Sequence, residues 1–150
     1  MKWFSGALLV LFFLSAGCQQ KKESVESRDT VRARKGELVW IVTNTIKPQA
    51  RGLYEKFMKE VFLHTMQTSK VDSTRSKFLH ARYLYPEVQN EDSSWTYVFI
   101  LESYSQNSDY SVFNVLKEKY GDIKAREYDD IYQSCLKGRP TLYKLIQSEY

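Results

Sequence analysis

His80 and Arg82 are the two residues of this sequence whose types and spacing best suit binding or acid–base chemistry. They lie in a largely apolar run at 77–85 that predicts a strand, and a spacing of two places both side chains on one face. Arg82 can hold a carboxylate or phosphate through two parallel hydrogen bonds, and His80 can act as an acid or base near neutral pH. The alternative is that 77–85 is an edge strand, whose polar side chains discourage aggregation.

The other polar residues form no pattern typical of catalysis or metal binding. His64 falls near the C-terminal end of a predicted helix, where the helix dipole favours its charge, and we expect a structural role rather than a haem or metal ligand. Two histidines, and one cysteine beyond the N-terminal segment, give no zinc-like spacing, so no metal is expected and no cofactor is indicated. No glycine-rich phosphate loop, G-x-S-x-G or H-E-x-x-H motif occurs. Solvated charge is the expectation for the carboxylates Glu87, Glu91, Asp92, Glu127 and Asp130.

The N-terminal residues have the order of a bacterial export signal. Lys2 precedes an apolar run at 7–14, which is shorter than the ~20 residues that a membrane-spanning helix needs. The small residues 15–17 then lead directly into Cys18. This order resembles the signal of bacterial lipoproteins, in which the peptidase cuts before a cysteine that already carries diacylglycerol.

The resemblance implies that Cys18 is lipidated, that membrane lipid is a partner and that the chain faces an extracytoplasmic space. Ser15 stands where such signals prefer leucine, so cleavage after Gly17 and simple secretion are the alternative. With Cys18 lipidated, Cys135 has no intramolecular disulfide partner, and we expect it to be a small buried apolar residue.

The segment 19–36 is predicted to be a disordered tether. It is poor in apolar residues and rich in Lys and Arg, and a flexible coil of this length reaches about 20–25 Å. The formal net charge of the whole chain is +4, and most of the basic excess lies before residue 37. Because the rest of the chain has no basic run with interleaved aromatic residues, no nucleic-acid partner is expected.

Residues 37–150 are predicted to form one α+β domain. The hydrophobic pattern predicts seven elements: strand 38–43, helix 48–67, strand 77–85, strand 95–101, helix 107–121, helix 125–136 and strand 141–147. This order is typical of the ferredoxin-like βαββαβ fold, with an extra helix before the last strand and a four-stranded antiparallel sheet in the order 4-1-3-2. In the first helix, Leu53, Phe57 and Val61 recur at helical spacing and are expected to face the core.

The two central strands carry different side chains on their two faces. Alternation separates β-branched residues from a set of aromatic residues, Trp40, Trp95, Tyr97 and Phe99. We expect helices to cover the compact β-branched face. An uncovered aromatic patch normally marks an interface or a ligand site, so we expect a second copy or a small ligand to cover the other. The alternative is that the extra helix or a loop covers it.

This element order with aromatic strands is similar to the dimeric α/β-barrel superfamily, including EthD-like and NIPSNAP-like proteins. The resemblance implies a homodimer in which two sheets pack face to face; its members include cofactor-free oxygenases, haem-handling proteins and proteins without known activity. No motif transfers a catalytic residue to this chain.

Two hypotheses for function follow. The first is a membrane-anchored lipoprotein whose dimeric domain binds a small apolar or aromatic ligand, or docks a partner, through His80, Arg82, Trp40, Tyr97 and Phe99. The second is a cofactor-free oxygenase or lyase that uses His80 and Arg82. We favour the first, because a lone histidine and arginine are too little for acid–base chemistry.

Overall fold

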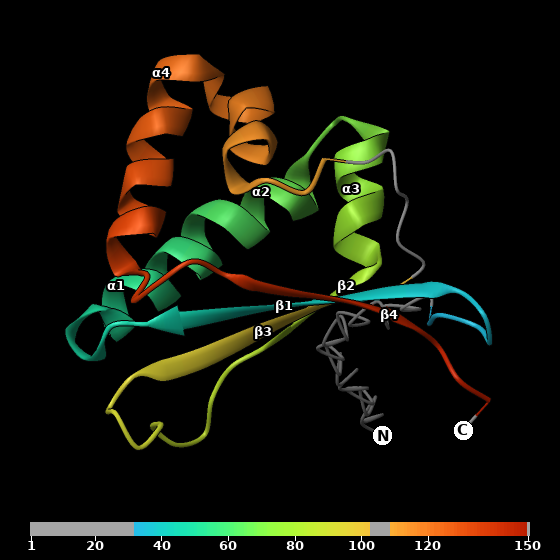
Figure 1. The fold of residues 1–150 in the computed structure, drawn as a ribbon. Coiled ribbons are helices and arrows are strands. Elements are labelled where there is room, and N and C mark those ends of the chain that lie inside the picture. The colour runs from blue at the N-terminus through green and yellow to red at the C-terminus, as the bar shows by residue number, and fades with distance from the viewer. Residues whose placement is uncertain (1–31, 103–108, 150) are drawn as a thin grey trace, which may run out of the picture.

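Strand β1 (Leu38–Ile46) forms the middle of the sheet, paired on both sides with antiparallel neighbours. The computed structural model describes residues 32–102 and 109–149. Within them, β2 (Ala81–Leu84), β3 (Trp95–Glu102) and β4 (Thr141–Ile146) complete a sheet in the order β2-β3-β1-β4 (Figure 1). This is the strand order predicted from the sequence, and the domain has the ferredoxin-like α+β arrangement.

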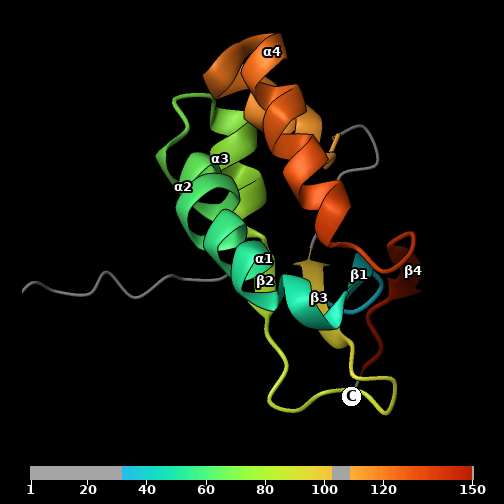
Figure 2. The same cartoon turned by 90° about the vertical axis from the view of Figure 1, so that its left-hand side faces the viewer.

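Helices lie on one face of this sheet, as Figures 1 and 2 show. The first is nearly continuous and consists of η1 (Pro48–Ala50), α1 (Arg51–Phe57), the π-helical turn η2 (Met58–Phe62) and α2 (Leu63–Thr68). Pro48 begins it, as the fixed φ of proline favours at a helix start. The long helix α4 (Val112–Cys135) bends at Gly121, whose φ of 74° favours glycine, so the two helices predicted there exist and join at this residue.

Helix α3 (Asp72–Leu79) occupies the place where the sequence predicted the beginning of a strand. The predicted strand 77–85 is therefore wrong over its first half, and β2 is only four residues long. The reason is that Thr74, Lys77 and Phe78 are all buried at helical spacing. The Lys77 Nζ also donates to the backbone carbonyl of Asp109 at 2.5 Å, which fixes the helix against the start of α4.

The aromatic face of the sheet is the face that the helices cover, so the predicted assignment of faces is wrong. The register places Phe99 opposite Val42 and Tyr97 opposite Asn44, and directly paired residues of antiparallel strands share a face. Tyr97 is 0 % exposed, and its ring centroid lies 4.7 Å from that of Tyr54 on α1. Aromatic rings fill the layer between sheet and helices better than short β-branched side chains do. The open face instead carries the compact side chains, Ile41, Thr43, Val98 and Ile100.

The core-facing side of the first helix is rotated by one residue from the prediction. Leu53 is 50 % exposed and lies outside the core, which corrects its predicted role. Tyr54 and Phe57 are buried, and the side chains of Met58, Phe62 and Met66 continue the buried stripe beyond the π-helical turn. The extra residue in this turn shifts the stripe relative to a regular α-helix.

The described chain begins beside the last strand. Gly36 N donates to Gln147 O at 2.9 Å, so the end of the predicted tether runs along the end of β4. The signal segment, Cys18 and most of the tether lie outside the described residues. Among the helices that are described, none has the length and apolarity needed to cross a membrane. Cys135 is a buried free thiol whose pKa is raised by burial, which confirms its expected role as a small core residue.

Candidate functional site

An open groove of about 980 Å³ separates residues 51–68 of the first helix from the edge strand β2. The groove can lie along the outer side of β2 because no other strand pairs with β2 on that side. In Figure 2 these elements lie next to each other on one side of the molecule. The apolar and aromatic lining consists of Met58, Leu63, Phe78, Ala81, Tyr83, Leu84, Tyr85 and Phe99. The polar lining consists of Arg51, Glu55, Lys59, His64, Gln67 and Arg82.

Three charged residues of the groove repeat at intervals of four along the helix. Arg51, Glu55 and Lys59 therefore form a row on one helix face. Arg51 Nε donates to Glu55 Oε1 at 2.9 Å, and its guanidinium lies 3.8 Å from the centre of the Trp95 ring. Lys59 is exposed and has no ion pair among the described residues.

Two side chains hold the ionised Glu55 carboxylate. The Tyr97 hydroxyl donates to Glu55 Oε1 at 2.6 Å, and this bond, followed by those of Arg51, lowers the pKa of the carboxyl. Burial, followed by the Glu55 carboxylate, raises the pKa of Tyr97. The groove thus has a carboxylate whose charge is already balanced, next to the cationic side chains of Lys59 and Arg82. Its polar rim favours an anion over a cation.

Arg82 sits where the groove meets the open face of the sheet. Its Nη2 donates to Glu102 Oε1 at 3.0 Å, and the Glu102 side chain is only 7 % exposed. Its Nε is buried and has no hydrogen-bond partner in the described structure. Arg82 therefore keeps an unused donor although one side of its guanidinium is paired.

A buried polar network lies behind the groove. Asn44 is 1 % exposed; its Nδ2 donates to the Tyr54 hydroxyl at 3.0 Å, and the Tyr132 hydroxyl donates to its Oδ1 at 3.1 Å. With Tyr83 and Tyr97, whose rings stack at 5.9 Å, these residues form what we call the tyrosine cluster (Tyr54, Tyr83, Tyr97 and Tyr132). Burial is the main cause that raises the pKa of all four hydroxyls.

A cavity of about 90 Å³ adjoins this network. It is lined by Asn44, Tyr132 and apolar side chains from the sheet and helices, including Met58, Phe62 and Phe99. This volume is well below the ~300–1,000 Å³ of typical ligand pockets. The cavity is therefore a small internal space behind the groove and not the main binding site.

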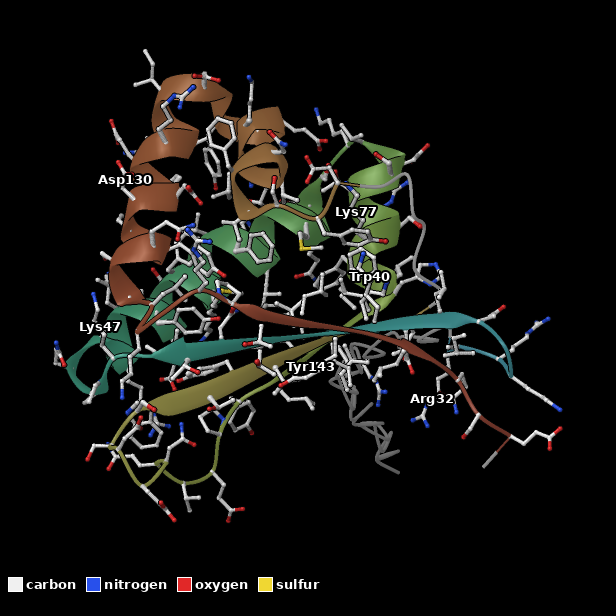
Figure 3. The ribbon with its side chains drawn as sticks, in the orientation of Figure 1. Arg32, Trp40, Lys47, Lys77, Asp130 and Tyr143 are labelled. Carbon is white, nitrogen blue, oxygen red and sulfur yellow. The ribbon has the colours of Figure 1, made fainter. Side chains whose placement is uncertain are left out.

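The structure separates the five ligand-binding residues predicted from the sequence. Arg82 and Phe99 line the groove, and Tyr97 reaches it through Glu55. His80 ends helix α3, with its Nδ1 buried and unpaired, and is not part of the groove lining. Trp40 lies near β4, with Lys144 Nζ 4.6 Å from its ring centroid; Figure 3 shows it on the helix side of the sheet, with Tyr143 on the opposite side.

His80 and Arg82 therefore do not both line this groove. Their separation follows from helix α3, which places His80 before the strand begins. His64, expected to be structural, is exposed and lines the groove. Within the described residues, no group of three or more His, Cys, Asp or Glu side chains could hold a metal ion.

The charged row of the first helix and Asn44 were not among the residues predicted from the sequence. The spacing of Arg51, Glu55 and Lys59 was a visible signal, because charges four apart on a helix share one face. Asn44 gave no such signal, since it follows the predicted end of the first strand and polar residues rarely lie in a strand core.

Comparisons with known proteins add little to this geometry. No protein-family model and no curated protein matches the sequence. Among solved structures, the chain is similar to a Caulobacter crescentus protein described as an antibiotic biosynthesis monooxygenase, with 14 % identity and a TM-score of 0.43. The match covers 77 % of this chain and 92 % of that protein. A likeness of this degree assigns neither a family nor an activity.

Proposed function

We propose that this chain is a lipid-anchored, extracytoplasmic binding module that holds a small amphipathic anion in the groove between the first helix and β2. The observation that carries the proposal is the combination of an apolar floor with a cationic rim in one groove. Ligand sites typically have this form, with a mostly apolar lining and a few polar groups that orient the ligand.

The rim chemistry indicates an acidic head group. Lys59 offers an ammonium with no ion pair among the described residues, and Arg82 adds a partly exposed guanidinium that Glu102 holds at the edge of the groove. Glu55 does not repel an anion strongly, because Arg51 and Tyr97 already hold it. A carboxylate or phosphate at this rim would leave its apolar body against Phe78, Leu63 and Phe99. Fatty acids and aromatic carboxylates have this shape.

The membrane anchor rests on the sequence of residues 1–18. An n-region lysine, a short apolar run and small residues before Cys18 support lipidation at that cysteine. More than one acyl chain is needed for stable anchoring, and a lipoprotein cysteine carries such a set. The anchor would hold the binding module close to a membrane surface, where amphipathic anions concentrate.

A homodimer is also part of the proposal, through the open face of the sheet. That face presents Ile41, Val98 and Ile100 at its centre and Tyr143 and Leu145 on β4, the last two 50 % and 45 % exposed. An apolar surface of this kind on a sheet is typical of an interface. The partner would therefore cover the face opposite to the helices.

The alternative enzyme would need His80 and Arg82 at one reacting group. Arg82 lines the groove and His80 does not, so the groove does not bring the two side chains together. We therefore favour binding over catalysis. The titration described next would also detect turnover of a bound ligand.

Titration of the purified lipoprotein with dodecanoate and with a naphthoate tests the groove. Lys59→Gln should weaken binding roughly ten- to hundredfold, as expected for the loss of one charge-assisted contact. Lys56→Gln is the matched control, because Lys56 is exposed on the same helix but does not line the groove. Equal affinities of wild type and Lys59→Gln, or no affinity for either probe, would contradict the proposal.

The anchor is tested separately by metabolic labelling with a fatty acid. Wild-type protein should take up the label and remain in the membrane fraction, while Cys18→Ala should take up none. A soluble, unlabelled wild type would replace the anchor with simple secretion.

A further inference from the structure

Strand β4 is uncovered on the same side of the sheet as the helices. Figure 2 shows β4 at the sheet edge, to the side of the helical layer. Alternation places Leu142, Lys144 and Ile146 together on this side; Leu142 is 43 % and Ile146 is 68 % exposed. An apolar edge strand in water is an aggregation hazard unless something covers it. We call these three residues the β4 strip.

Charged residues of both signs lie where the chain joins the domain, next to the end of the β4 strip. Arg32 and Arg34 are exposed, and the backbone of Gly36 pairs with Gln147 directly after β4. Figure 3 places Arg32 near the end of β4, on the Tyr143 side of the sheet, and Lys35 pairs with Glu149 just after that strand. Lys144 adds a charge in the middle of the strip itself. The strip therefore combines two aliphatic side chains with one cation.

The distance to the proposed anchor makes this corner the part of the domain nearest to the membrane. Roughly 14 residues separate Cys18 from Arg32, and a flexible chain of that length spans about 20 Å. A short tether gives a high effective concentration of the surface to which it is attached, so even weak contacts become populated.

We propose that the β4 strip rests on an anionic lipid bilayer surface. This inference rests on the proposed lipid anchor. Leu142 and Ile146 enter the interfacial region, and Lys144 contacts the lipid headgroups, where an anionic surface attracts it. The strip and the proposed dimer face lie on opposite sides of β4, because successive residues alternate. Docking and dimer formation therefore do not compete.

Tryptophan fluorescence in vesicles tests the docking directly. Maturation at Cys18 removes Trp3, so Trp95→Phe leaves Trp40 as the only tryptophan, close to Lys144 of the strip. The matched control is Trp40→Phe, which leaves Trp95 at the far end of the sheet, about 20 Å along β1 at 3.3–3.4 Å per residue. Both proteins are reconstituted in phosphatidylcholine vesicles that contain brominated lipid, with and without phosphatidylglycerol.

We expect bromine to quench Trp40 in the anionic vesicles and to leave Trp95 unquenched. Lys144→Gln should weaken the docked state about fivefold, from roughly one charge at the surface, and Ile146→Ser should reduce quenching as well. Both residues are exposed, so neither change should disturb folding. If the protein floats with the vesicles but Trp40 is unquenched, or is equally quenched in neutral lipid, the docking is wrong and the anchor stands. A protein that does not float overturns the anchor itself.

Discussion

Asn44→Leu is expected to destabilise the domain far more than an ordinary polar-to-apolar change in a strand. Asn44 lies between two buried tyrosines, donating to the Tyr54 hydroxyl and accepting from the Tyr132 hydroxyl. Leucine has the same branching and number of side-chain heavy atoms but no polar group. The substitution therefore leaves two hydroxyls without their partner in the core.

The size of the effect follows from the number of groups left unpaired. Each buried polar group without a partner costs about 1–3 kcal/mol, so two of them give roughly 2–6 kcal/mol. A domain of this size has a total stability of about 5–15 kcal/mol, so a large part of it would be lost. The variant Asn44→Leu/Tyr54→Phe/Tyr132→Phe has no orphaned hydroxyl, and removing all the partners of such a network is often nearly neutral.

Urea unfolding, followed by circular dichroism, measures both free energies of unfolding. We expect the single variant to lower the midpoint strongly with an unchanged slope, and the triple variant to recover more than half of the loss. If the three substitutions lower the free energy of unfolding additively, the triple variant is the least stable of all. Orphaned hydroxyls would then not be the cause of the loss in Asn44→Leu.

Three further results are expected. Phe57→Ala should cost about 3–5 kcal/mol of the free energy of unfolding while Leu53→Ala costs less than about 1 kcal/mol, and a larger loss for Leu53→Ala would contradict the placement of the first helix. Burial raises the pKa of every member of the tyrosine cluster, that of Tyr132 to about 12. The tyrosines of the unfolded chain therefore ionise first as the pH rises. The free energy of unfolding should hold below about pH 10 and fall above it. Ionisation of these four tyrosines in the folded protein, followed by the NMR signals of their rings, would oppose this order. Val98→Glu should yield a monomer in sedimentation, and a wild type that is itself monomeric would remove the proposed dimer.

The order of elements could be predicted because most of them have local signals. The β-branched and aromatic runs that became β1 and β3 are both bounded by turn residues, and Gly121 marks the bend in α4 by its positive φ. The region before β2 gave a false signal. Phe78 and Leu84 fit a strand alternation, although Phe78 belongs to a helix face together with Thr74.

The assignment of faces could not be predicted for a physical reason. Both central strands are apolar on both sides, so alternation identifies two faces without saying which one the helices cover. Of the ligand-binding residues predicted from the sequence, Arg82 and Phe99 line the groove, whereas His80 lies before the strand and Trp40 lies near β4. Asn44 is buried only because tyrosines from two different helices reach it, and such long-range pairing leaves no local pattern.

Native mass spectrometry of the mature lipoprotein, extracted gently from membranes of its own host, tests the central claim most directly. We expect the wild type to carry a small anionic molecule that is released on denaturation, and the same molecule to be retained by Lys56→Gln and lost from Lys59→Gln. A wild type that carries no such molecule would contradict a binding site in the groove. So would a bound molecule that Lys59→Gln retains fully.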